Sequence, residues 1–161
     1  YGIDSSLHRF WLKIDDDDRY SSDYLTRVVQ VFRWTGADVV GTQARHVYDV
    51  PSDVSRYRAR ADDRNFRDLR SGASPEFVSG AWLAGDRRAP LPRFSTRTRH
   101  GCDSQFVSDC LRSGLRVFSD VPNHVVVRRH NRHDHTWQVG EKEVIWPILC
   151  AGDHAAHWSG S

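Results

Sequence analysis

The chain has 161 residues, 39% of them hydrophobic, which is enough for one compact domain with a hydrophobic core. Its 23 basic and 21 acidic side chains leave a formal net charge of +2, which supports neither a nucleic-acid partner nor a membrane-surface role. No segment is long and apolar enough to span a bilayer, and no secretory signal is visible. The 3 cysteines have the spacing of neither a disulfide framework nor a metal site, so we expect a cytoplasmic protein, either free or at the cytoplasmic face of the membrane.

The first part of the chain predicts strands and a helix in alternation. Residues 10–14 are apolar and predict a buried strand, which we expect to lie centrally in a sheet. Apolar side chains then recur at helical spacing over about 23–34, and Gly36 ends the predicted helix. Two further strands are predicted at 38–43 and at 45–50, the second as a return or edge strand.

A polar segment follows. Residues 51–75 are rich in Arg and Asp and predict an exposed insertion or a solvated helix. Residues 77–84 are apolar and predict a strand, in which Gly80 indicates a bend or a close approach of the backbone. Residues 86–101 combine Pro, Gly and many Arg, and therefore predict a loop.

The last part of the chain predicts one clear helix and two short strands. Asp103 or Ser104 is expected to cap a helix that ends near Gly114. The remaining predictions are strands at 115–118 and 124–128 and a weak helix from 141 on. This alternation is typical of an α/β fold, which we assign to a single domain over residues 1–161.

Four consecutive aspartates, Asp15 to Asp18, follow the first predicted strand; we call them the aspartate run. Charges at this density repel one another, and a divalent cation would offset the repulsion. Carboxylate oxygens are the ligands that Mg²⁺ and Mn²⁺ prefer, and open α/β sheets bind ligands at the carboxyl ends of their strands. The run therefore indicates a metal site, and the alternative is a solvated acidic turn.

Three motifs in one order carry a family resemblance. They are Asp-Asp-Asp-Asp-Arg-Tyr at 15–20, Ser-Gly-Ala-Trp-Leu-Ala at 79–84, and Gly-Cys-Asp-Ser-Gln-Phe at 101–106 before an Arg/His-rich segment. Over residues 10 to 139 the chain resembles the family 2 glycosyltransferases of GT-A fold, in particular the bacterial branch that builds capsule or other surface polysaccharides. The resemblance implies a GT-A-like (Rossmann-like) mixed sheet flanked by helices, of which this chain would be the C-terminal portion.

The resemblance also implies roles at the donor site. Asp17 would bind Mn²⁺ or Mg²⁺ directly, and Asp15 would lie near the metal and the ribose or sugar. Asp16 would contact the donor, although four aspartates permit a shift of one residue in this register. His135 matches a histidine that some GT-A enzymes add to the metal, with a solvated loop as the alternative. Arg129 follows an apolar strand and is placed to reach a diphosphate, with surface charge as the alternative.

Further residues match the acceptor side of the family. Asp103 falls on the family's catalytic carboxylate, and Cys102 replaces the acidic residue that often precedes it. Asp103 would then be the general base, although a helix cap is its alternative and compatible role. Ser79, Gly80 and Trp82 match the segment that borders the acceptor, while Trp82 is also an ordinary core residue.

These matches imply a metal-dependent inverting glycosyltransferase that moves a sugar from a nucleotide-sugar donor to a saccharide acceptor in polysaccharide biosynthesis. The family places roughly a hundred residues of nucleotide-binding structure before the aspartates, where this chain has fourteen. We therefore expect a fragment of a longer enzyme, with a further N-terminal segment or other domains as partners. The alternative is a non-catalytic GT-A-like module for folding or interaction. A metal-dependent hydrolase or phosphotransferase is less favoured, because neither Lys13 nor Lys142 is well placed for it.

Overall fold

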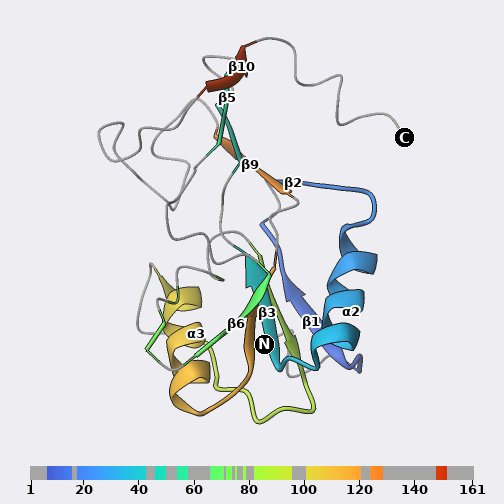
Figure 1. Cartoon of the computed structure of the whole chain (residues 1–161), viewed down its shortest axis with the longest axis vertical. Helices are drawn as coiled ribbons and strands as arrows, with labels where there is room; N and C mark the ends of the chain where they lie inside the picture. Colours follow the sequence, from blue (N-terminus) through green and yellow to red (C-terminus); the bar gives the residue numbers. More distant parts are fainter. Residues whose placement is uncertain are drawn as a thin grey trace.

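Two sheets and two helices make up the described part of the chain in the computed structural model (Figure 1). The described residues are 7–15, 18–42, 46–49, 54–57, 66–70, 72–73, 75, 78, 82–95, 101–120, 124–128 and 148–151.

The first sheet is mixed. Its strands in spatial order are β1 (Phe10–Lys13), β7 (Trp82–Asp86), β3 (Val39–Thr42), β8 (Val117–Ser119) and β6 (Arg67–Leu69). Strands β3 and β8 pair in parallel, and β7 pairs antiparallel with both β1 and β3, so β1, β3 and β8 run in the same direction. The predicted α/β class, a mixed sheet flanked by helices, is confirmed at this level.

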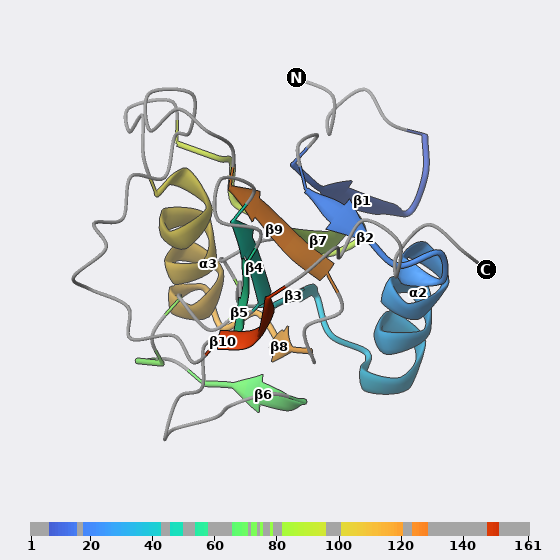
Figure 2. The same cartoon turned by 90° about the horizontal axis from the view of Figure 1, so that it is seen from above.

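Helices α2 (Tyr24–Thr35) and α3 (Cys102–Arg112) cover opposite faces of this sheet (Figure 2). Strand alternation supplies a hydrophobic core to each face: Val39 packs in the cluster on the α3 side, and Val40 in the cluster on the α2 side. Neither helix is long and apolar enough to cross a membrane, and none other is described.

The second sheet lies beyond the ends of β3 and β8 (Figure 1). Its strands in spatial order are β10 (Ile148–Ala151), β5 (Val54–Tyr57), β4 (His46–Asp49), β9 (His124–Arg128) and β2 (Arg19–Tyr20). Strands β4 and β9 follow β3 and β8 along the chain and are again parallel to one another. The two parallel strands of the first sheet therefore lead directly into the second.

Several predicted elements are confirmed to within one or two residues, namely β1, α2, β3 and β9. The predicted central position of β1 is wrong, because β1 is the edge strand of the first sheet and pairs only with β7 among the described residues. Phe10, Trp11 and Leu12 of β1 pack in the cores on the two faces of the sheet, which explains their apolar character. This packing does not determine which strands lie beside β1 in the sheet. Strand β4 was expected at an edge, but it lies inside the second sheet between β5 and β9.

Other boundaries differ more. The described residues of the polar segment 51–75 include strands β5 and β6 and no helix, since cross-strand pairing outweighs the low apolar content of these strands. The predicted strand 77–84 begins only at Trp82, and the described part of the loop prediction at 86–101 contains no strand beyond Asp86. In the tail, residues 148–151 form strand β10 instead of a helix because they pair with β5.

Helix α3 also begins earlier than predicted. Its N-cap residue is Gly101, with φ of 73°, so Asp103 and Ser104 belong to the first turn and do not cap the helix. A carboxylate in the first turn still interacts favourably with the helix dipole. The helix ends at Arg112, two residues before Gly114, whose φ of 75° suits the left-handed turn that follows.

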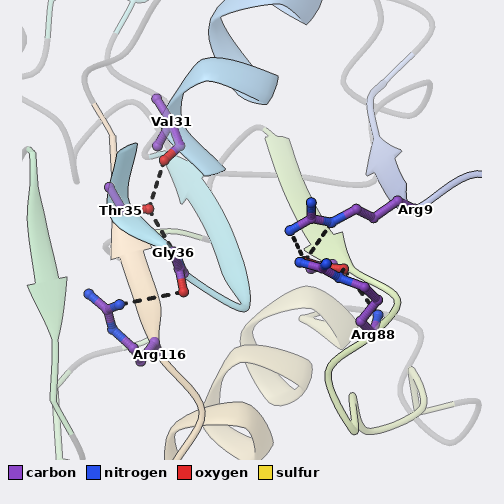
Figure 3. Close-up of polar contacts among 8 residues, drawn as sticks. Arg9, Val31, Thr35, Gly36, Arg88 and Arg116 are labelled. Carbon is purple, nitrogen blue, oxygen red and sulfur yellow. Dashed lines mark hydrogen bonds and ion pairs between the residues drawn. The ribbon is translucent and has the colours of Figure 1, made fainter. Parts of the chain in front are cut away.

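The edge of the first sheet where β7 ends is held by ionic and helix-end contacts (Figure 3). Asp86 is 6% exposed and accepts hydrogen bonds from Arg9 Nη2 at 2.8 Å and Arg88 Nη2 at 3.0 Å. At the end of α2, the Thr35 hydroxyl donates to the Val31 carbonyl at 2.7 Å. These contacts hold the ends of β7 and α2 in place.

Gly41 gives a test of the packing beside the opposite edge of the first sheet. A Cβ atom at Gly41 would lie 2.1 Å from the Val78 carbonyl oxygen, which is a backbone atom in a buried position. We expect Gly41→Ala to lower the free energy of unfolding by about 3 kcal/mol, because either strand β3 or the backbone at Val78 must move to make room for the new methyl group. At Gly36 the backbone φ is 62°, but the nearest atom to an added Cβ would be Arg116 Nη1 at 3.4 Å. Gly36→Ala should therefore lower the free energy of unfolding by only about 1 kcal/mol, from backbone strain alone. Urea unfolding measures both, and equal effects would contradict the crowding argument.

Candidate functional site

The carboxyl ends of the three co-directional strands lie at one edge of the first sheet, which we call the carboxyl edge. Because α2 follows β1 and α3 precedes β8, both helices begin at this edge. Strand β7 runs the other way and therefore begins there as well. The described residues at the carboxyl edge that matter below are Asp15, Asp18, Tyr20, Tyr24, Arg27, Thr42, Trp82, Asp103 and Asp120.

The two described residues of the aspartate run, Asp15 and Asp18, lie close together after the end of β1. The Asp18 N–H donates to the Asp15 carbonyl at 3.3 Å. The Tyr20 hydroxyl accepts from the Asp15 N–H at 2.9 Å and lies 3.3 Å from the Asp15 carbonyl oxygen. The Asp15 carboxylate pairs with Lys13 Nζ at 3.0 Å. Lys13 thus offsets the charge of the Asp15 carboxylate.

A buried ion pair stands at the end of β8. Asp120 is fully buried, and its two carboxylate oxygens accept from Arg27 of α2 at 2.7 and 3.0 Å. The Thr42 hydroxyl donates to the Asp120 carbonyl at 3.3 Å. The sequence analysis did not identify Arg27 or Asp120. An aspartate two residues after the predicted strand 115–118 was an available signal, but it did not specify the partner on α2.

An aromatic row connects the aspartate run with the core. Tyr20 and Tyr24 have ring centroids 4.7 Å apart, and Tyr24 meets Trp82 edge to face at 5.5 Å. Tyr24 and Trp82 are 3% and 1% exposed, and neither the Tyr24 hydroxyl nor the Trp82 indole N–H has a hydrogen-bond partner among the described residues. In this position the Trp82 ring is part of the core.

The Tyr24 hydroxyl is held in its protonated form. Burial is the main cause that raises its pKa far above the usual value. The neighbouring Tyr20 and the charges of Asp120, Asp15 and Asp18 raise it further. The hydroxyl therefore keeps its proton and can donate a hydrogen bond. The sequence pattern gave no signal for Tyr24 beyond its place within the predicted helix over about 23–34.

Asp103 lies in the first turn of α3, at the carboxyl edge. Its side chain is half-buried, and its Oδ1 atom accepts a hydrogen bond from the Ser104 N–H at 2.9 Å. One carboxylate oxygen thus supports the start of the helix. The arrangement is compatible with both roles considered for Asp103, and its distance from Asp17 lies outside the described residues.

The other predicted site residues cannot be located in the described part of the chain; they are Asp16, Asp17, Ser79, Gly80, Arg129 and His135. Among the described residues no group of three or more His, Cys, Asp or Glu side chains is close enough to hold a metal ion. The carboxylates of Asp15 and Asp18 leave the same turn, and their oxygen donors fit Mg²⁺ or Mn²⁺ in chemistry. The buried Tyr24 hydroxyl has no hydrogen-bond partner among the described residues, and the charges of Asp15 and Asp18 contribute to its raised pKa.

Comparison with known proteins adds no relative. No protein-family model matches the chain, and no curated protein matches it significantly. The family resemblance therefore depends on the three sequence motifs alone.

Proposed function

We propose that this chain belongs to a metal-dependent inverting glycosyltransferase of GT-A-like fold, which transfers a sugar from a nucleotide-sugar donor to a saccharide hydroxyl. The observation that supports the proposal best is topological. The mixed sheet brings the turn of the aspartate run and the start of α3, with Asp103, to the same carboxyl edge. Open α/β sheets bind their ligands at this edge.

The donor side of the reaction requires charge neutralisation. A bound Mn²⁺ or Mg²⁺ supplies positive charge to the diphosphate leaving group. Asp17 and Asp15 would hold this ion, and His135 would complete its ligands. Asp16 and Arg129 would bind the nucleotide sugar, Arg129 through a phosphate oxygen.

The acceptor side of the reaction requires a general base and residues that hold the acceptor in a fixed position. Asp103 would take the proton from the acceptor hydroxyl as it attacks the anomeric carbon. Ser79, Gly80 and Trp82 would border the acceptor, with Trp82 acting from within the core rather than by stacking an exposed ring. With one base and no evident protein nucleophile, the product has inverted anomeric configuration. We place this activity in the cytoplasm, where free thiols such as Cys102 and Cys110 stay reduced.

The test of the metal site is Asp17→Asn in the full chain. We expect titration calorimetry to show Mn²⁺ binding that strengthens when UDP, GDP or CMP is present. Asp17→Asn should weaken it at least tenfold, because a charged ligand becomes neutral while its size is retained. Circular dichroism should show an unchanged fold.

A matched control is Asp109→Asn, which changes an aspartate on α3 that pairs with Arg112. This variant should bind Mn²⁺ as the unmodified chain does. If Asp17→Asn also keeps full affinity, the ligands are Asp16 and Asp18, or the run binds no metal and the proposed function is contradicted.

A further inference from the structure

The edge of the first sheet opposite the carboxyl edge is built from the amino ends of β1, β3 and β8; we call it the amino edge. Strands β6 and β7 run the other way and end there, as do both helices. The Arg87 N–H donates to the Arg9 carbonyl at 2.8 Å, and the Asp38 N–H donates to the Arg116 carbonyl at 2.9 Å. The Arg116 guanidinium reaches the Gly36 carbonyl at the end of α2 (Figure 3). These contacts join the ends into one continuous surface.

Charge is distributed unevenly between the two edges. Arginines exceed carboxylates at the amino edge, where the exposed cations are Arg9, Arg33, Arg70, Arg87, Arg88 and Arg116 and the carboxylates beside them are Asp38, Asp68 and Asp86. Among the described residues of the carboxyl edge, Asp15, Asp18, Asp23, Asp103 and Asp120 outnumber Lys13, Arg19, Arg27 and Arg67. The formal net charge of +2, taken over the whole chain, does not reveal this separation.

Contacts within the described part of the chain balance only some of this positive charge. Arg9 and Arg88 share the single carboxylate of Asp86, at 2.8 and 3.0 Å. Arg33 and Arg87 are exposed and form no ion pair with another described residue. The dipole of α2 favours a cation in its last turn, which accounts for Arg33 but not for Arg87. The amino edge is therefore suited to an anionic partner.

An exposed tryptophan lies at the same edge. Trp34 is in the last turn of α2, next to Arg33, and is 67% exposed, whereas Val31 and Phe32 of that turn are buried. Tryptophan is enriched where a membrane meets water, because its ring is largely apolar and its N–H is polar. A surface that binds single-stranded nucleic acid usually stacks successive bases on several aromatic rings. One exposed indole beside several arginines fits a lipid headgroup region better.

We propose that the amino edge docks this chain on the surface of an anionic lipid bilayer, with Trp34 at the level of the headgroups and the arginines against lipid phosphates. Each basic side chain near such a surface strengthens binding about fivefold. The carboxyl edge then faces away from the lipid. The proposal goes beyond the proposed sugar transfer and does not depend on it.

The experiment measures sedimentation of the full chain with vesicles of phosphatidylcholine alone, or of equal parts phosphatidylcholine and phosphatidylglycerol. We expect binding to the anionic vesicles only, and weaker binding as salt is raised. Arg33→Gln/Arg87→Gln should bind about 25-fold more weakly, because two cations are removed. Its circular dichroism should be unchanged, since both side chains are exposed.

Tryptophan emission gives a second measurement. Emission of the unmodified chain should shift to shorter wavelength on the anionic vesicles, as the exposed ring of Trp34 leaves water. Trp34→Phe should retain most of the binding and lose this shift. A shift that persists in Trp34→Phe would contradict the proposed orientation.

The matched control is Arg19→Gln/Arg67→Gln, which removes two exposed cations from the carboxyl edge. Strand β7, of 5 residues, separates the edges by about 16 Å, more than the Debye length of about 10 Å at 0.1 M salt, so binding should change less than about twofold. Equal losses in the two double variants would overturn the proposal. Equal binding to both kinds of vesicle, no binding to either, or release from the anionic vesicles by duplex DNA at equal phosphate concentration would also overturn it.

Discussion

Replacement of Arg27 by methionine is expected to lower the free energy of unfolding by about 3–5 kcal/mol, because it leaves the charge of Asp120 buried without a partner. Asp120 is fully buried, and Arg27 provides both hydrogen bonds to its carboxylate, at 2.7 and 3.0 Å. Methionine keeps the length and helix propensity of arginine and removes the charge. Urea unfolding followed by circular dichroism measures the loss.

Two further variants separate the ion pair from general effects on the helix. Arg33→Met changes an exposed arginine on α2 and should alter the free energy of unfolding by less than about 0.5 kcal/mol. The double variant Arg27→Met/Asp120→Leu should recover part of the loss, since no charge remains buried. A loss below about 1 kcal/mol for Arg27→Met alone would mean that the pair does not tie α2 to the end of β8.

Under the proposed function, Asp103→Asn is expected to reduce sugar transfer by about 10²–10⁴-fold and to leave donor binding nearly unchanged. The general base acts on the acceptor proton, which is absent from the donor complex. The substitution suits this site because an asparagine oxygen can still accept from the Ser104 N–H, as Asp103 Oδ1 does at 2.9 Å. Helix α3 should therefore persist.

Single-turnover transfer and separate calorimetry with the nucleoside diphosphate measure the two effects. Asp109→Asn, on the same helix, is the control for a charge change without a catalytic role. Undiminished transfer by Asp103→Asn would leave Asp103 with its helix-start contact only, and the inverting mechanism would need another base.

Local elements were predictable where side-chain periodicity was strong. Helix α2 carries Val28 and Phe32 toward the sheet and ends at Gly36 in the left-handed region, as the spacing indicated. Strands β1 and β3 were predictable for the same reason, since helices cover both their faces and their side chains are correspondingly apolar. The polar strands β5 and β6 gave no such signal, because pairing with neighbouring strands stabilises them.

The candidate site likewise has features that the sequence predicted and features that only the tertiary structure decided. Sequence alone predicted that an acidic segment follows a strand and that a helix starts close to Asp103, because both features depend on residues close together in the chain. Only the tertiary structure decided that β1 is an edge strand, that Arg27 reaches Asp120 across 93 positions, and that the Tyr24 hydroxyl lies buried beside the aspartate run. These features depend on which strands become neighbours and on what each face buries. Lateral pairing and burial are properties of the whole sheet, and the local sequence pattern does not contain them.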